Sequence, residues 1–235
     1  MRTVVEPVVH PDLVHMDADA FEVDGATFRV AYSQESTAEW LSIAKSPDLI
    51  NAYARLIEDG QPKTIVELGI FGGGSTALLA LLASPRKLVA LELDPDPLPG
   101  LAAFIDARGI GGSVRPFYGV DQGDRARVTE IVEQEFGSDA IDLVVDDASH
   151  LLVETRASFE TLFPRLRPGG VYVIEDWAAH HQHAAAVVAT TAADAADPMP
   201  PERPALERLG RLLQSDQPER YEPITRLLLQ LILAR

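Results

Sequence analysis

The sequence contains no cysteine, which excludes disulfide bonds, thiolate metal sites and cysteine nucleophiles without identifying the compartment. Basic residues are also scarce, since 20 lysines and arginines stand against 36 acidic residues and give a formal net charge of −16. This charge opposes binding to nucleic-acid phosphates and to anionic membranes. We therefore expect a small-molecule partner, with no nucleic acid and no membrane.

Long apolar runs are missing as well. The N-terminal segment MRTVVEPVVHPD lacks the apolar core of a signal peptide, and the apolar run at residues 227–234 is too short to span a bilayer. With 235 residues, of which 46% are hydrophobic and 24% charged, the composition is that of an ordinary globular protein. These features predict a cytoplasmic protein with a single structural domain and some additions.

From residue 64 onward, buried apolar segments alternate with helical patterns. Strands are predicted over residues 64–68, 88–91, 113–118, 141–145 and 171–174. Helices are predicted over residues 76–82, 98–105 and 128–136, and a further helix, beginning near Leu151, is marked by Phe159, Leu162, Phe163 and Leu166 and ended by Pro168, Gly169 and Gly170. Such alternation is typical of the α/β class with a doubly wound, mostly parallel, Rossmann-like sheet.

Residues 1–60 precede this alternation and form an N-terminal addition. Residues 21–32 alternate around Asp24 and Gly25, which predicts a tight β-hairpin. Ser46 is an expected N-cap for a helix that ends at Gly60. This hairpin and helical cap either covers the substrate end of the sheet or only packs on the core.

Acidic residues end two of the predicted strands. Asp146 and Asp147 follow the strand at 141–145, and Glu175 and Asp176 follow the strand at 171–174. Because parallel strands end at one rim, where open α/β sheets bind ligands, these four carboxylates should converge there. Their repulsion favours a cation, and hard oxygen ligands suit a magnesium-like ion. The alternative is that the acids only cap the helices that follow.

A glycine-rich turn follows the first predicted strand. It contains Glu67, Gly69, Gly73, Gly74 and Ser75, and its missing side chains would let the backbone approach a ligand. Glu92 ends the second strand, where a carboxylate can accept hydrogen bonds from ribose hydroxyls. The G-x-G-x-x-G fingerprint of dinucleotide enzymes is absent, and the acidic residue before the turn favours a cationic ligand with sulfonium and amino groups.

Several of these motifs together resemble a known family. The segments VELGIFGGGST, VALELDP, YGVDQGD, VVDDASH and PGGVYVIEDW resemble class I S-adenosylmethionine-dependent methyltransferases. The likeness is greatest to the magnesium-dependent macrocin and mycinamicin sugar O-methyltransferases and to the cephalosporin hydroxylase-like group. It covers residues 62–177, with Ala148 in place of a glycine that is common in the family, and it is weak after Trp177.

The resemblance implies that S-adenosylmethionine and Mg²⁺ are the cofactors and that residues 61–235 are the S-adenosylmethionine-binding domain. It implies Mg²⁺ ligation by Asp147, Glu175 and Asp176, and catalysis by Asp147 and His150, with His150 as the base. The alternative for His150 is that it caps the helix beginning near Leu151. The residues assigned to cofactor binding are Glu67, Gly69, Gly73, Ser75, Glu92, Asp121, Gln122 and Asp146, with Asp121 and Gln122 beside the adenine.

The leading hypothesis is a magnesium-dependent O-methyltransferase that acts on a hydroxyl of a sugar or phenolic natural product. The alternatives are a cephalosporin hydroxylase-like oxidative tailoring enzyme and a non-catalytic S-adenosylmethionine-binding subunit. His180, His181 and His183 either lie on a solvated helix face or touch substrate or metal. The closing antiparallel strands typical of the fold are not visible after Trp177, so we expect an uncovered sheet edge and a homo-oligomer.

Overall fold

The computed structural model of the chain describes residues 13–15, 19–32 and 36–176. These residues form two compact units. The first unit contains the described residues up to 62 together with residues 71–84 and 98–111. The second contains residues 63–70, 85–97 and the described residues from 112 onward. The predicted division between residues 60 and 61, within a single structural domain, stays a prediction.

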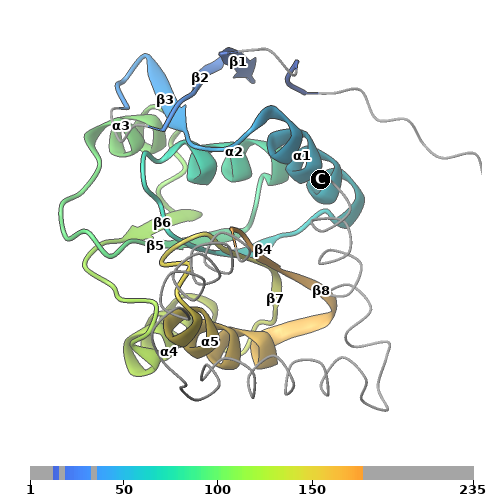
Figure 1. Ribbon diagram of the computed structural model, residues 1–235, viewed down its shortest axis with the longest axis vertical. Helices are drawn as coiled ribbons and strands as arrows, with labels where there is room; N and C mark the ends of the chain where they lie inside the picture. The colour runs from blue at the N-terminus through green and yellow to red at the C-terminus, as the bar shows by residue number, and fades with distance from the viewer. Residues whose placement is uncertain (1–12, 16–18, 33–35, 177–235) are drawn as a thin grey trace, which may run out of the picture. The chain divides into compact units, whose positions relative to one another are not determined.

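A five-stranded parallel sheet forms the centre of the second unit (Figure 1). Its strands lie in the order β6-β5-β4-β7-β8. The first strand of the sheet, β4, is therefore central; β5 and β6 extend the sheet on one side of it, and β7 and β8 extend it on the other. This reversal between β4 and β7 is the strand order of a doubly wound sheet and confirms the predicted fold class. The strands are β4 (Thr64–Leu68), β5 (Lys87–Leu91), β6 (Val114–Phe117), β7 (Ile141–Asp146) and β8 (Leu166–Ile174).

Two helices of the second unit pack against this sheet and lie side by side (Figure 1). Helix α4 (Arg125–Phe136) begins at Asp124, whose side chain accepts a hydrogen bond from the backbone N–H of Arg127, and α5 covers Leu152–Leu162. Apolar residues spaced by three and four positions on α4 face the strands, as the sequence predicts. The shared core contains Val66, Leu68, Val89, Leu91, Val128, Ile131, Val132, Phe136, Ile141, Val144 and Leu162.

The helix predicted from near Leu151 to Pro168 extends too far at its C-terminal end. In the structure α5 ends at Leu162, a single 3₁₀ turn covers Phe163–Arg165, and Leu166 already begins β8. Pro164 explains the early end, because proline has no N–H to donate and its ring clashes with the carbonyl four residues earlier. The Pro168–Gly170 segment, which was expected to stop the helix, instead lies within β8, where the pairing with β7 shifts register.

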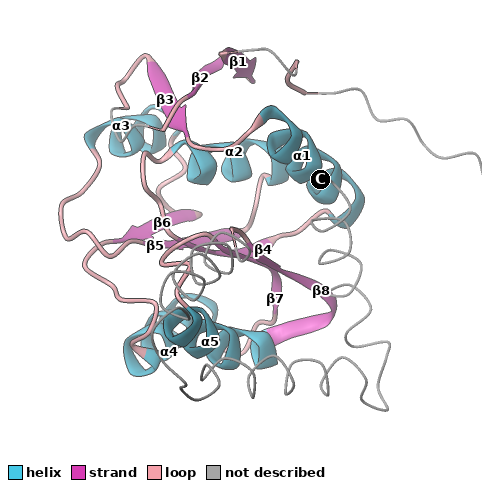
Figure 2. Ribbon diagram, viewed as in Figure 1, coloured by secondary structure: helices cyan, strands magenta, loops and turns pink. Residues whose placement is uncertain are grey.

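The first unit contains a small three-stranded sheet and three helices (Figure 2). β1 (Ala20–Val23) and β2 (Ala26–Val30) form the predicted hairpin, and both turn residues, Asp24 and Gly25, have positive φ. β3 (Trp40–Ile43) pairs in parallel with β2 and was not predicted as a strand. The helices are α1 (Pro47–Gly60), capped by Ser46 as predicted, α2 (Gly74–Ala83) and α3 (Pro99–Arg108).

No helix in the described ranges has the length and apolar character that crossing a bilayer requires. The predictions for Trp177, for His180, His181 and His183, and for the closing strands concern residues outside the described ranges.

Candidate metal and cofactor site

The carboxyl ends of β7 and β8 lie beside each other, as the sequence predicts. Asp146 pairs with Ile174 in the sheet, and the backbone N–H of Glu175 donates to the carbonyl oxygen of Asp146 at 2.9 Å. Asp147, which follows β7, and Asp176, which lies two residues after β8, are therefore both at the carboxyl-end rim of the sheet. This edge is beside the β4–β7 reversal point, where doubly wound sheets bind their ligands.

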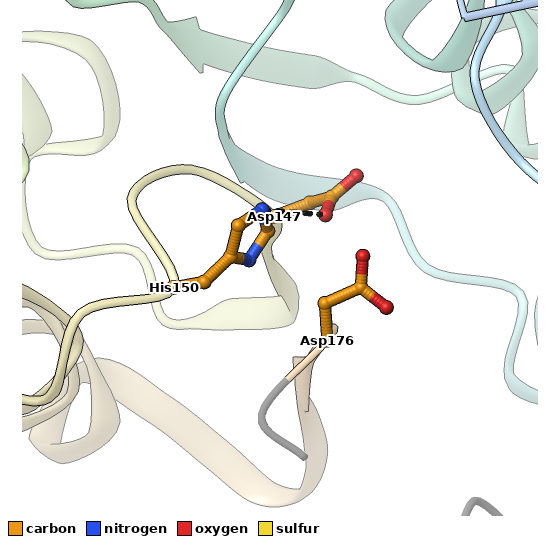
Figure 3. Close-up of side chains that lie close together, drawn as sticks. All are labelled: Asp147, His150 and Asp176. Carbon is orange, nitrogen blue, oxygen red and sulfur yellow. Dashed lines mark ion pairs between the residues drawn. The ribbon is translucent and has the colours of Figure 1, made fainter. Parts of the chain in front are cut away.

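Asp147, His150 and Asp176 form the candidate metal group (Figure 3). Each offers one ligand atom, and these atoms all lie within 4.8 Å of one another. Nε2 of His150 is 3.9 Å from Oδ1 of Asp147, and all three side chains are at least partly exposed. Two carboxylates this close favour a bound cation, and Mg²⁺ is typically held by one or two carboxylates plus water. The two carboxylates of the group therefore fit a hard divalent cation.

Glu175 is not part of this group. Its side chain is buried, whereas Asp176 is exposed, so the two successive carboxylates lie in different environments. Asp147 and Asp176 come together as predicted, and His150 takes the third position in the geometric group. Metal ligation by Glu175 stays a prediction.

Asp146 also faces away from the candidate metal group, because successive side chains of a strand point to opposite faces. Its carboxylate is 2% exposed and accepts hydrogen bonds from Oγ of Ser158 (2.7 Å), the hydroxyl of Tyr172 (3.1 Å) and Nε2 of Gln122 (3.1 Å). Burial raises the pKa of the Asp146 carboxyl, and these hydrogen bonds act in the opposite direction. In this structure the residue anchors the end of β7 from inside the core.

Two residues of the candidate metal group have an unusual backbone conformation. His150 has φ of 56° and Asp176 has φ of 51°, both in the left-handed region that L-residues other than glycine rarely adopt. Such conformations cost free energy and persist only where neighbouring contacts enforce them. Beside His150, Oγ of Ser149 accepts a hydrogen bond from the backbone N–H of Leu151 at 3.1 Å. Strained backbone at both positions is a common feature of ligand-binding sites.

The two predicted cofactor glycines each have a packing role that the sequence pattern did not reveal. Gly69 has φ of 89°, and a Cβ there would lie 2.3 Å from the carbonyl oxygen of Asp147. Gly73 has φ of 84°, and a Cβ there would lie 2.9 Å from Cβ of Leu101. Any larger residue at Gly69 would therefore displace the backbone that carries Asp147.

Glu67 and Ser75 lie in regular elements on either side of the glycine turn. Glu67 is buried one residue before the end of β4, and Ser75 is partly exposed in the first turn of α2. Their predicted roles in cofactor binding stay predictions.

Glu92 lies just past the end of β5, as predicted. Its Oε2 accepts a hydrogen bond from the backbone N–H of Ile70 at 2.9 Å, and its Oε1 accepts one from Asp94 at 3.1 Å. Glu92 therefore shapes the start of the glycine turn. Its predicted role in binding the ribose of the cofactor stays a prediction.

The two residues expected beside the adenine differ in exposure. Asp121 is exposed, and its Oδ1 accepts a hydrogen bond from the backbone N–H of Gly123 at 2.7 Å. Gln122 is buried, and both ends of its side-chain amide are hydrogen-bonded within the second unit. A structural role for Gln122 was not predicted, because it depends on residues distant in the sequence.

Comparison with known proteins shows that this chain is similar in sequence to methyltransferases. Residues 66–177 match a family described as a methyltransferase domain. The 8-demethyl-8-alpha-L-rhamnosyl tetracenomycin-C 2'-O-methyltransferase of Streptomyces olivaceus is 37% identical over 101 residues, covering 33% of this chain and 27% of that protein. Demethylmacrocin O-methyltransferase of Streptomyces fradiae is 48% identical over 61 residues, covering 26% of this chain and 15% of that protein.

A solved structure supports the fold assignment. Cofactor-bound Rv0187 from MTB aligns with a TM-score of 0.51 at 20% identity, covering 74% of this chain and 70% of that chain. The matches confirm the resemblance to methyltransferases that the motifs indicate. The chain spans less than a third of the length of the two Streptomyces relatives.

Proposed function

Because residues 66–177 carry a methyltransferase domain, we propose that the protein is a magnesium-dependent, S-adenosylmethionine-dependent O-methyltransferase whose acceptor is a hydroxyl of a sugar or phenolic natural product. The observation that carries this proposal is the group of Asp147, His150 and Asp176 at the ligand-binding edge of the sheet. A domain that only bound a nucleoside cofactor would not need two carboxylates and an imidazole within 4.8 Å. The choice of acceptor class is supported by the names of two relatives, the 8-demethyl-8-alpha-L-rhamnosyl tetracenomycin-C 2'-O-methyltransferase and demethylmacrocin O-methyltransferase.

Methyl transfer to an alcohol needs alignment of the acceptor oxygen with the methyl carbon and removal of the hydroxyl proton. When bound, S-adenosylmethionine supplies an activated methyl group and Mg²⁺ supplies Lewis-acid polarisation of the acceptor hydroxyl. Asp147 and Asp176 would hold the cation through one carboxylate oxygen each, with Glu175 as a further proposed ligand. His150 would accept the hydroxyl proton at an imidazole nitrogen, since imidazole is the side chain best suited to proton transfer near neutral pH.

The cofactor is proposed to bind along the turn that follows β4, with Glu92 accepting hydrogen bonds from the ribose. In calorimetry, S-adenosylhomocysteine should bind without acceptor, and Glu92→Ala should weaken binding by about 1 to 3 kcal/mol. Asp96→Ala is the matched control, because Asp96 is an exposed carboxylate on the same loop outside the proposed site. Tight binding of NADH with no binding of S-adenosylhomocysteine would end the cofactor proposal.

The activity is tested with labelled S-adenosylmethionine and a panel of glycosides and catechols, in Mg²⁺ or in EDTA. We expect transfer of label in Mg²⁺, a product heavier by one CH₂, and loss of transfer in EDTA. A product heavier by one oxygen would instead support the oxidative tailoring alternative. Equal transfer in EDTA would remove the metal from the proposal while keeping the methyltransferase activity.

We also propose that the protein self-associates. Among the described strands, β8 occupies one edge of the five-stranded sheet, and a sheet edge can pair with another chain. Light scattering should report a homo-oligomer, and a monomer at high concentration would contradict this expectation.

A further inference from the structure

Gln122 is a buried polar residue on the loop between β6 and α4. Its Nε2 donates hydrogen bonds to Oδ1 of Asp146 and to Oγ of Ser158, both at 3.1 Å. Its Oε1 accepts a hydrogen bond from the backbone N–H of Ser149 at 2.8 Å. A single side chain thus joins the end of β7 to the loop that follows it.

These contacts fall on both sides of the residues that carry the proposed chemistry. Asp146 directly precedes Asp147, and Ser149 directly precedes His150. Between them, the backbone N–H of Asp147 donates to the carbonyl oxygen of Leu68 at 2.9 Å. The peptide backbone around Asp147 is therefore fixed from two directions, by β4 and by the side chain of Gln122.

The left-handed conformation of His150 makes the contact at Ser149 important. Without constraints the backbone of His150 would relax to negative φ, because φ of 56° brings Cβ close to the carbonyl oxygen. The hydrogen bond from Ser149 to Gln122 holds the residue immediately before this strained position. Loss of that bond would let the loop relax and would change the positions of the His150 imidazole and the Asp147 carboxylate.

We propose that Gln122 is a positioning residue that sets the loop bearing Asp147 and His150, and so controls metal affinity at the candidate group. This inference rests on the proposed function and assigns Gln122 a role other than contact with the cofactor. The contacts of Asp146 with Ser158 and Tyr172 do not involve Gln122, so they can hold β7 when Gln122 is replaced. Replacement of Gln122 should therefore free Ser149 and its neighbours while the sheet stays intact.

The first test is amide hydrogen exchange of the full chain without ligand. In Gln122→Met, which keeps the approximate shape but removes the acceptor, exchange at the Ser149 amide should accelerate by about 2- to 10-fold, the loss expected for one hydrogen bond. Exchange at Val144, within β7, should stay unchanged. Unchanged exchange at Ser149 in the folded variant would overturn the proposal, whatever the activity of the protein.

The second test separates metal binding from cofactor binding. Titration with Mn²⁺ should show affinity about 10- to 100-fold weaker in Gln122→Met, the usual effect of losing a residue that orients a metal ligand. Titration with S-adenosylhomocysteine should give the same affinity as the parent within about twofold, because the glycine turn and Glu92 are untouched. Equal weakening of both ligands, or weakening of S-adenosylhomocysteine alone, would overturn the proposal in favour of a cofactor contact.

Two variants serve as matched controls. Asp124→Ala removes the N-cap of α4 from the same loop but no contact with Ser149, so it should lower stability without changing Ser149 exchange or Mn²⁺ affinity. Tyr172→Phe removes one donor to Asp146 and leaves the bond between Gln122 and Ser149, so Ser149 exchange should again match the parent. A parent protein that binds neither Mn²⁺ nor S-adenosylhomocysteine overturns the proposed function, and the exchange test then still decides whether Gln122 holds the loop.

Discussion

Asp142 lies near the start of strand β7 and Asp147 lies just past its end, and the two carboxylates differ in the charged and polar groups around them. Near the start, Asp142 accepts hydrogen bonds from the backbone N–H groups of Lys63 (2.7 Å) and Thr64 (2.9 Å) and from Nε of Arg167 (2.5 Å). Just past the other end, Asp147 lies in a group with a second carboxylate, Asp176, and an imidazole.

The surroundings of these two aspartates indicate a structural role at the start of β7 and a binding role just past its end. At Asp142 the protein itself supplies a cation and N–H donors, so the carboxylate joins β4, β7 and β8 where the strands begin. At Asp147 the neighbouring carboxylate adds negative charge, which a bound cation would neutralise. Asp142 therefore stabilises the fold at the start of β7, and Asp147, just past the end of β7, is the carboxylate that we propose as a metal ligand.

The largest expected effect is that of Asp147→Ala on activity. Methyl transfer should fall by about 10³-fold or more, because a metal ion contributes several kcal/mol to stabilising charge in a transition state. The free energy of unfolding should change by less than about 0.5 kcal/mol, and S-adenosylhomocysteine should still bind. Initial rates and urea denaturation check both parts. An Asp147→Ala variant that keeps the parent's Mg²⁺-dependent rate would show that Asp147 has no role in metal-dependent methyl transfer.

His150 should show the next largest effect, and two substitutions separate its chemistry from its strain. His150→Ala and His150→Gly should both lower turnover by about 10²-fold, the lower end of the usual range for a general base, without releasing the metal. Only glycine adopts positive φ without cost, so His150→Gly should be more stable than His150→Ala by about 1 kcal/mol. Turnover and denaturant midpoints test this, and equal stability of the two variants would show that the left-handed backbone is not strained.

Much of the fold follows from sequence because most strands of the parallel sheet are short runs that consist largely of apolar residues. The predicted strand at residues 64–68 coincides with β4, and Ser46 caps α1 as predicted. Strand β3 was missed because its four residues carry no alternation of their own and pair with β2 across the intervening loop. The end of α5 was misplaced because the apolar spacing continued through Pro164, which a helix interior does not tolerate.

Part of the candidate site could be predicted because the order of the strands and helices could be predicted. Strand ends in a parallel sheet share one edge, so the meeting of Asp147 with Asp176 could be predicted from the order of the elements. The inward direction of Asp146 could have been found from the alternation of side chains along β7. The role of Gln122 could not, because its partners, Asp146 and Ser158, lie 24 and 36 residues away and only the folded chain brings them together.

Asp142→Ala should have a smaller effect, and on stability instead of activity. Two backbone N–H groups lose their acceptor and Arg167 loses its partner, so the free energy of unfolding should fall by about 2 to 3 kcal/mol. Asp139→Ala is the control, since its ion pair with Arg86 is exposed and should contribute less than about 1 kcal/mol. Urea denaturation measures both variants. A folded Asp142→Ala protein with a lost methyl-transfer rate would show that the two ends do not divide their roles.

The smallest expected effect is the pH dependence of the stability that Asp142 contributes. Burial would raise the pKa of the Asp142 carboxyl, but hydrogen bonds from Lys63, Thr64 and Arg167 prevail and hold it below the ordinary value of 3.8. A carboxyl whose pKa is lower in the folded state stabilises the protein above its unfolded pKa, and this stability is lost as pH falls through the folded pKa. The stability gap between the parent and Asp142→Asn should therefore be constant near neutral pH and narrow below about pH 4. Urea denaturation at a series of pH values measures this difference in stability. A difference that widens in acid would mean that the folded protein favours the protonated form of Asp142. That result would contradict a carboxylate stabilised by N–H donors and Arg167.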